Sequence, residues 1–323
     1  SPTHAMDPYG LHEFEVHNAE KGHTPITFNE HSLDVLKKFK PNFLIDTSGN
    51  GTLFEYISNS DPTLLEQISL ALVYDSQIEK SVTQLEEAHQ SFPPIIDYFK
   101  NETRSYFAND GGLKIERTLL RNVNDDFRNK KVAIIGYGHA GKGCAKVFQD
   151  KNMDVVIVEH KAKNKLKAYR NGFKVASKKE ALKGADLVIS LTGAPSVVSP
   201  EDLENLKDHA ILFTLGYQGE FNLEGIKYLK TERLNDLVDE HTLSNHKRIR
   251  VFAKGTSAIS FPEKSEYLPL DQDRNSSLFL LLSIHGWKLR ETLHRNTLYE
   301  VVGPADDEYA EIELKLAGIS EQI

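Results

Sequence analysis

Apolar and polar positions alternate most regularly between about Lys130 and Pro262. Short apolar runs, typical of strands buried on both faces of a parallel sheet, are separated there by stretches with helical spacing. The runs predict strands at 131–136, 153–159, 172–176, 185–193, 210–216 and 248–255. Helices are expected between them at about 141–150, 164–171, 178–184 and 200–207. The pattern therefore predicts an α/β fold with a doubly wound parallel sheet.

The pattern before residue 112 is less regular and indicates a second, smaller α/β unit. Stretches with helical spacing alternate there with short apolar runs. The helical stretches are 31–39, 63–72 and 81–92, and the apolar runs are 42–46 and 93–99. Residues 111–123 predict a helix that leads into the regular region.

The pattern changes again after Pro262, where 275–293 predict a long apolar helix and 306–319 a more polar one. We therefore expect three parts and a cleft between the first two. These parts are a smaller domain formed by 1–111 with 263–290, a doubly wound domain at 112–262, and a C-terminal tail at 291–323. The apolar helix and the tail offer more apolar surface than the chain can cover alone, so a homo-oligomer is expected.

Three glycines form a G-x-G-x-x-G turn between the first predicted strand and helix of the regular region: Gly136, Gly138 and Gly141. The first glycine permits the tight turn, the second lets the backbone approach a pyrophosphate, and the third lets helix and strand pack closely. The helix N-terminus adds N–H donors and the positive end of its dipole. Glu159 closes the second strand, where a carboxylate accepts hydrogen bonds from ribose hydroxyls. The sequence predicts a Rossmann-type dinucleotide site; the alternative is a glycine turn without a ligand.

Glu159 also favours NAD over NADP, because its carboxylate would repel a 2′-phosphate. The residues that follow it, HKAKNKLKAYR, are strongly basic and could instead be a phosphate clamp. We interpret them as the solvated face of the next helix.

Composition and charge exclude several classes of function. The formal net charge of −8 gives no electrostatic reason to bind nucleic acid or an anionic membrane. No apolar run approaches the roughly 20 residues of a membrane helix, and the first residues lack the pattern of a signal peptide. The single cysteine, Cys144, fits a reducing cytoplasm. Four scattered histidines (12, 17, 23 and 31) suggest a metal site, but their spacing matches no local ligand pattern, so no metal is expected.

The glycine turn continues in a way that resembles one enzyme family. Residues 136–148, GYGHAGKGCAKVF, are similar to the NAD fingerprint of the S-adenosylhomocysteine hydrolases (adenosylhomocysteinases). The similarity continues through 189–229, which resembles the family's T-G turn and its strand ending in G-H-F-D. Segments at 42–57, 275–287 and 297–319 also resemble the family. The family's leading segment and its last C-terminal extension have no counterpart here, so the chain resembles a divergent, shortened member.

The resemblance implies which residues bind NAD. They are Gly136, Gly138, His139, Ala140, Gly141, Glu159, Thr192, Gly193 and Gly216. In the family, NAD oxidises the 3′-hydroxyl of the substrate ribose, the thiol leaves, water adds, and the ketone is reduced again. Such chemistry needs acids and bases positioned around the sugar.

Most catalytic positions of the family differ in this chain. The second aspartate of D-D-G-G becomes Thr47, although Asp46 keeps the first. The histidine of G-H-F-D becomes Tyr217, and the glutamate of S-E-E-T aligns with Asp75. The family's K-x-K-F-D-N appears as RSYFAN, which keeps Asn109 but has Arg104 in place of a lysine. An arginine cannot lose its proton as a lysine can, so ordinary S-adenosylhomocysteine hydrolysis is not expected.

Two hypotheses follow for the function. In the first, the chain is a repurposed NAD-dependent oxidoreductase that acts on a hydroxyl or ketone of a nucleoside or another small polar metabolite. Tyr217 would act as acid or base, Arg104 and Asn109 would orient the substrate, and Asp75 or Asp46 would supply a carboxylate. In the second, it is a catalytically inactive relative that binds NAD and works through a protein partner. Tyr217 could then be only a packed aromatic residue.

Overall fold

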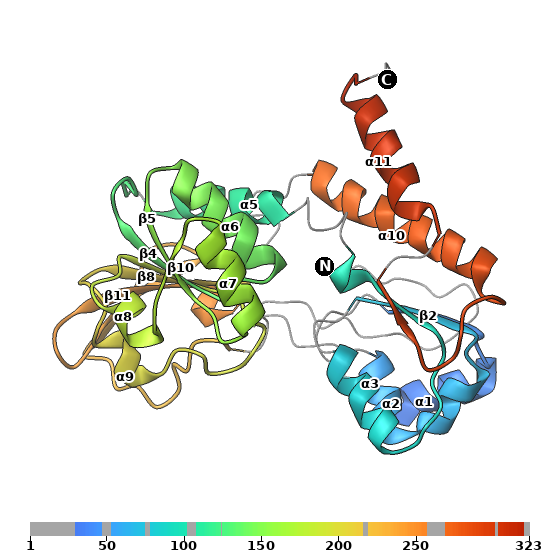
Figure 1. The fold of residues 1–323 in the computed structure, drawn as a ribbon. Helices are drawn as coiled ribbons and strands as arrows, with labels where there is room; N and C mark the ends of the chain where they lie inside the picture. Colours follow the sequence, from blue (N-terminus) through green and yellow to red (C-terminus); the bar gives the residue numbers. More distant parts are fainter. Residues whose placement is uncertain are drawn as a thin grey trace.

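The computed structural model describes residues 30–46, 53–74, 78–101, 108–123, 125–215, 219–256, 269–300 and 303–319. Its strands form two separate sheets, each with helices on both faces, in two lobes (Figure 1). Among the described helices, none is long and apolar enough to cross a membrane.

The larger sheet has eight strands in the described part of the chain. Their order is β6-β5-β4-β7-β8-β11-β10-β9. They are β4 (Lys131–Ile135), β5 (Asp154–Val158), β6 (Lys174–Val175), β7 (Leu187–Ser190), β8 (Ala210–Thr214), β9 (Lys230–Arg233), β10 (Val238–Thr242) and β11 (Arg248–Phe252). The pairings from β6 to β11 are parallel, and the direction of winding reverses between β4 and β7. This is the doubly wound order of dinucleotide-binding sheets, so the expected fold class is confirmed.

Helices cover both faces of this sheet because its strands are apolar on both sides. They are α5 (Ala108–Asn122), α6 (His139–Asp150), α7 (Ala162–Arg170), α8 (Lys178–Leu182) and α9 (Pro200–Leu203). One face packs under α5 and α6 around Phe148 and Phe213, and the other under α8 and α9 around Leu182 and Leu212. A Cβ on Gly112 of α5 would lie 2.7 Å from the carbonyl oxygen of Gly143 in α6. The two helices therefore approach each other more closely than larger side chains would allow.

The smaller sheet is parallel throughout and has the order β1-β2-β3-β12. Its strands are β1 (Phe43–Asp46), β2 (Leu70–Val73), β3 (Ile95–Asp97) and β12 (Leu298–Tyr299). One face packs against α1 (Glu30–Phe39), α2 (Leu53–Ser60) and α3 (Ile78–Glu87), and the other against α10 (Pro269–Leu289) and α11 (Ala305–Leu316). In β2, Ala71 and Val73 face the first group while Leu70 and Leu72 face the second. Short 3₁₀ turns occupy Pro62–Gln67, Tyr98–Lys100 and Ala253–Gly255.

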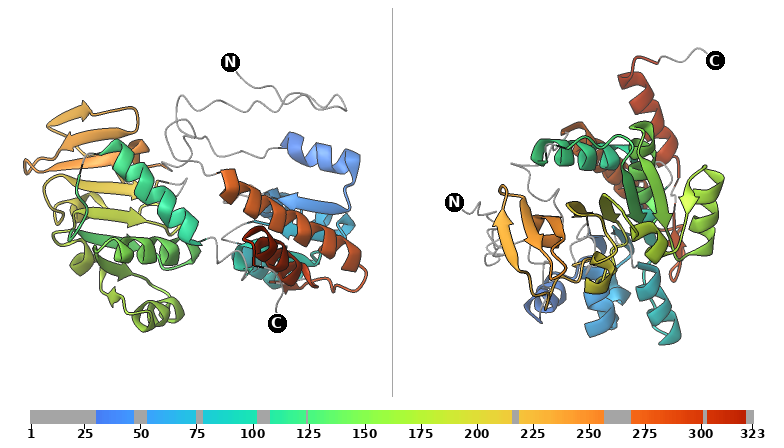
Figure 2. Two further views of the ribbon diagram at one scale, coloured as in Figure 1. Left: turned by 90° about the horizontal axis from the view of Figure 1, so that it is seen from above. Right: turned by 90° about the vertical axis from the view of Figure 1, so that its left-hand side faces the viewer.

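Three expectations from the sequence need correction. Residues 63–72 do not form one helix: a 3₁₀ turn is followed by β2, whose residues are all buried at the centre of the smaller sheet. The strands β9 and β10 were not expected; they form an antiparallel extension at the outer edge of the larger sheet (Figure 2). Both strands consist mostly of polar residues, and all four residues of β9 are exposed, so no apolar run in the sequence predicted them. Finally, 291–323 is not only a tail, because β12 pairs with β3.

Candidate cofactor-binding site

The glycine turn lies where the two halves of the larger sheet diverge. The backbone N–H of Gly136 donates to the carbonyl of Val158, and that of Leu191 donates to the carbonyl of Ile135. The ends of β4, β5 and β7 are therefore tied together at the carboxyl edge of the sheet. Ligands of open α/β sheets bind at this edge, where the strand order reverses.

Each glycine of the turn meets a different steric requirement. Gly136 has a φ of +97°, and a Cβ there would lie 2.9 Å from the carbonyl oxygen of Leu191. At Gly141 a Cβ would lie 2.0 Å from the carbonyl oxygen of Gly136, so α6 could not pack so closely against β4. A Cβ on Gly138 would meet nothing within 4 Å. The described residues therefore do not require a glycine at 138, and the glycine leaves the backbone there open to the pyrophosphate of a dinucleotide.

Glu159 lies at the end of β5 and faces the glycine turn. Its carboxylate accepts hydrogen bonds from the backbone N–H groups of Tyr137, at 2.9 Å, and of His160 and Lys161, both at 2.8 Å. The side chain is 4% exposed. Burial raises its pKa, but the hydrogen bonds from Lys161, Tyr137 and His160 outweigh burial and hold the pKa below its usual value. The carboxylate is therefore ionised at neutral pH, as its expected role against a 2′-phosphate requires.

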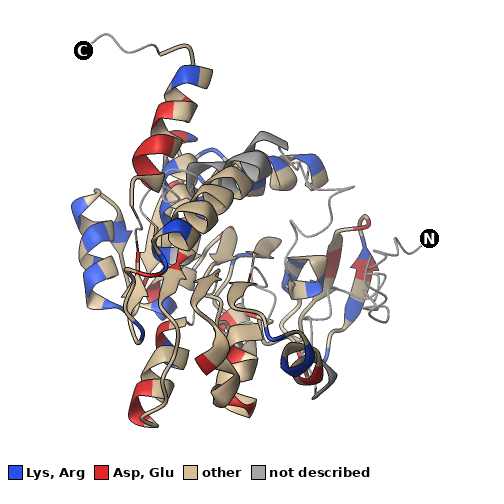
Figure 3. Ribbon diagram, turned by 90° about the vertical axis from the view of Figure 1, so that its right-hand side faces the viewer, with Lys and Arg blue, Asp and Glu red and all other residues tan. Residues whose placement is uncertain are grey.

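The basic run after Glu159 forms α7, which buries only Ala168. Its lysines at 163, 165 and 167 are exposed, and Figure 3 shows Lys and Arg gathered along this helix. This agrees with the interpretation of a solvated helix face. Lys142, in the first turn of α6, lies near this basic helix. Burial lowers the pKa of Lys142, and the positive charges of Lys167 and Lys163 lower it further.

The turn after β7 is held by a residue that the sequence did not reveal. Glu220 is fully buried. Its carboxylate accepts hydrogen bonds from the hydroxyl of Ser190 at 2.5 Å and from the hydroxyl of Thr192 at 2.7 Å. It also accepts from the backbone N–H groups of Thr192 at 3.0 Å and Gly193 at 3.1 Å. Glu220 follows the last glycine of LGYQGEF, and nothing in that local pattern indicates that its side chain reaches back to β7.

The expected cofactor residues that the structure describes come together from three elements. Gly136, Gly138, His139, Ala140 and Gly141 lie in the turn and the first turn of α6, Glu159 at the end of β5, and Thr192 and Gly193 after β7. Gly216 lies outside the described residues.

The expected catalytic residues are described less completely. Tyr217, Arg104 and Asp75 lie outside the described residues. Asn109 lies in the first turn of α5, but its side chain is not described. Asp46 ends β1 and is buried, and its carboxylate accepts the backbone N–H of Phe54 at 2.8 Å at the start of α2. These five assignments remain predictions.

Residues 115–258 match the family model described as S-adenosyl-L-homocysteine hydrolase, NAD binding domain. The matched segment contains the glycine turn, Glu159, Glu220 and the strands from β4 to β11. NAD, the cofactor expected from the glycine turn and from Glu159, is thereby confirmed for this domain.

Two curated relatives extend the similarity beyond this domain. An adenosylhomocysteinase from Thermotoga maritima is 27% identical over 242 residues, which are 73% of this chain and 59% of the relative. An adenosylhomocysteinase from Gloeothece citriformis is 27% identical over 253 residues, 76% of this chain and 57% of the relative. The chain thus spans less than two thirds of the length of the relatives it matches.

Solved structures with a similar arrangement are more distant. The TT0316 protein from Thermus thermophilus has a TM-score of 0.45 and 12% identity, over 70% of this chain and 79% of that chain. The A chain of dipicolinate synthase from Bacillus subtilis has a TM-score of 0.39 and 14% identity, over 69% of each chain.

Proposed function

Because the chain is a divergent relative of the S-adenosylhomocysteine hydrolases, we propose that it is an NAD-dependent oxidoreductase. Its substrate would carry a hydroxyl or ketone on a nucleoside-like or other small polar molecule. The hydrolase activity named in the relatives is not carried over, because most of that family's catalytic positions differ in this sequence.

One observation carries the proposal: the turns after β4 and β7 meet where the strand order reverses, and Glu159 faces the first of them. The N-terminus of α6 and the backbone at Gly138 would hold the pyrophosphate, and Glu159 the adenosine ribose. When bound, NAD would exchange a hydride with the substrate through its nicotinamide ring. The nicotinamide would then lie toward the turns that follow β7 and β8.

The residues proposed for substrate chemistry are far apart in the sequence. Tyr217, after β8, would transfer a proton to or from the substrate hydroxyl. Arg104 and Asn109 would orient the substrate, since a guanidinium and an amide bind polar groups with defined geometry. Asp75 would supply a carboxylate, and Asp46 less readily, because its carboxylate already accepts the N–H of Phe54.

A second candidate function is an inactive relative that binds NAD and works through a protein partner. The capping role of Asp46 favours it, because a carboxylate engaged with the start of α2 is less available to a substrate. The two candidates differ in one measurable property: only the oxidoreductase transfers a hydride.

Calorimetric titration with NAD tests the cofactor site that both candidates share. We expect the wild type to bind and Gly138→Val to lose binding while keeping its fold, since a side chain at 138 would enter open space. Gly141→Val is the contrasting variant: it should lower the melting temperature, because its Cβ would meet Gly136. Wild-type protein that does not bind NAD would contradict both candidates.

Hydride transfer separates the two candidates. Purified protein with NAD would be incubated with nucleosides and small polar alcohols, and NADH followed by its absorbance. Formation of NADH with any of them, lost in Tyr217→Phe, supports the oxidoreductase. Tight NAD binding without NADH formation, together with a stable complex with another protein, would favour the second candidate.

A further inference from the structure

Glu220 is a fully buried carboxylate that binds only groups of the β7 end and turn in the contacts described above. A buried charge is costly unless it is hydrogen-bonded. Here Oε2 accepts from Ser190 and Thr192, and Oε1 accepts from the N–H of Gly193. Both oxygens are therefore used to fix the backbone at 192–193.

The turn that Glu220 fixes touches the glycine turn. A Cβ on Gly136 would meet the carbonyl of Leu191 and, at 3.3 Å, the Cγ2 atom of Thr192. The position of residues 191–193 therefore sets the spacing between the two turns at the reversal of the strand order. The adenosine side of the site, with Gly138 and Glu159, lies on the β5 side of this point.

We propose that Glu220 is a positioning residue for the nicotinamide half of the bound dinucleotide. By accepting the N–H groups of Thr192 and Gly193 in the interior, it holds this turn in the conformation that leaves room for the nicotinamide. It makes no contribution to the adenosine half, which is held by Gly138, the start of α6 and Glu159. The inference rests on the proposed binding of NAD at this edge of the sheet.

The conservative variant Glu220→Gln tests this role. A glutamine has one acceptor oxygen, so in either orientation its NH₂ group faces an N–H or hydroxyl donor of the β7 turn. We expect the affinity for NAD to fall by about 10- to 100-fold, the usual effect of leaving a buried polar group unsatisfied. The affinity for ADP-ribose, which lacks nicotinamide, should stay within about twofold of wild type.

Two further variants make the result specific. Glu240→Gln removes another buried carboxylate of the same lobe, one bound to Arg250 and His209 rather than to the β7 turn. It should lower stability while leaving the affinities for NAD and ADP-ribose unchanged. Ser190→Ala removes one hydroxyl donor to Glu220 at the end of β7 and should weaken NAD binding selectively but less than Glu220→Gln. It keeps the test possible if Glu220→Gln does not fold.

Calorimetry with both ligands on all four proteins gives distinct outcomes. Selective loss of NAD affinity in Glu220→Gln or, if that variant does not fold, in Ser190→Ala supports the positioning role. Equal loss of NAD and ADP-ribose affinity would show a general structural role and overturn the inference, as would unchanged NAD affinity in a folded Glu220→Gln. If the wild type binds ADP-ribose but not NAD, the inference fails together with the proposed oxidoreductase. If it binds neither, the dinucleotide site itself is wrong.

Discussion

At the scale of single residues, the site depends on where a side chain is absent as much as on where one is present. Gly138 has room for a Cβ, whereas Gly136 and Gly141 do not. The described part of the chain therefore imposes no packing requirement on Gly138, which is the expected property of a position kept open for a ligand. The other two are needed for the turn even without one.

Glu159 gives a prediction on cofactor choice. Its ionised carboxylate should repel the 2′-phosphate of NADP, so the wild type should bind NAD more tightly than NADP in calorimetry. Glu159→Gln keeps the shape but removes the charge, and the ratio of the two affinities should shift toward NADP by about tenfold or more. The ratio is the relevant quantity because the amide also disturbs the N–H groups of Tyr137 and Lys161. Tighter binding of NADP by the wild type would instead assign the choice to the lysines of α7.

Tyr217 gives a prediction on catalysis. Tyr217 follows β8 in the sequence, and β8 is a parallel neighbour of β7, so both strands end at the same edge of the sheet. If Tyr217 acts as an acid or base there, Tyr217→Phe should lower turnover by about 10²- to 10⁴-fold with nearly unchanged NAD affinity. Steady-state kinetics together with NAD titration would measure both. Normal turnover in the Phe variant would remove the tyrosine from the mechanism.

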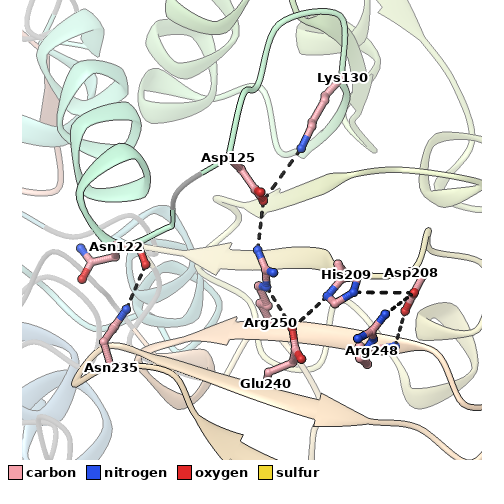
Figure 4. A network of polar contacts seen from close by, with 9 residues as sticks. All are labelled: Asn122, Asp125, Lys130, Asp208, His209, Asn235, Glu240, Arg248 and Arg250. Atoms are coloured by element: carbon pink, nitrogen blue, oxygen red, sulfur yellow. Dashed lines mark hydrogen bonds and ion pairs between the residues drawn. The ribbon is translucent and has the colours of Figure 1, made fainter.

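At the scale of elements, a polar network attaches the antiparallel edge of the larger sheet to the rest of the lobe (Figure 4). Arg250 of β11 donates to Glu240 of β10 and to Asp125, which follows α5, at 3.0 Å in each case. His209, before β8, contacts Glu240 at 2.9 Å. The hairpin β10–β11 is thereby joined to two segments distant in sequence through one arginine and one glutamate.

The network predicts how stability depends on pH. Burial raises the pKa of Glu240, but hydrogen bonds from Arg250 and His209 outweigh burial and lower it overall. A carboxyl group with a lowered folded-state pKa stabilises the protein above its ordinary value of 4.5, and this contribution is lost as the pH falls through the folded-state pKa. Glu240→Gln should therefore lower the free energy of unfolding by about 1–3 kcal/mol at pH 7. Denaturant melts should show the difference shrinking on acidification; a constant difference would contradict the charge-based account.

At the scale of the whole molecule, the smaller lobe presents apolar side chains that the described parts of the chain leave exposed. Leu280 of α10 is 60% exposed and Leu316 of α11 is 81% exposed. Within α11 only Ala305 and Tyr309 are buried, and the helix extends away from α10 toward its C-terminal end (Figure 1). Exposed apolar residues on adjacent helices are typical of a protein–protein interface.

We therefore predict that the chain forms a homo-oligomer through α10 and α11. Light scattering over a range of concentrations should show a mass above that of the monomer, and Leu280→Glu with Leu316→Glu should shift it toward the monomer. Leu166→Glu is the matched control, since Leu166 is an exposed leucine of α7 in the other lobe. A strict monomer, or the same shift in the control, would contradict this interface.

The sequence by itself determined the parallel part of the larger sheet and, within its cofactor site, the glycine turn and Glu159. Short continuous apolar runs are typical of strands covered on both faces, and a glycine turn between strand and helix has a local cause, so both can be predicted from the order of residues. Gly136, Gly138, Gly141 and Glu159 were found in this way, as were β4, β5, β6, β7, β8 and β11.

Only the tertiary structure decided the features that depend on residues far apart in the chain. The stretch 63–72 has helical spacing, yet β2 forms because the sheet around it buries both of its faces. The polar strands β9 and β10 form because β10 pairs with the edge of β11 and β9 pairs with β10, and β12 forms because it pairs with β3. Glu220 could not be predicted as a site residue from the sequence, because only the pairing of β8 with β7 places it where its carboxylate accepts hydrogen bonds from Ser190 and Thr192. Local pattern encodes burial and turns, whereas the partners of an edge strand or a buried charge are fixed only when the chain folds.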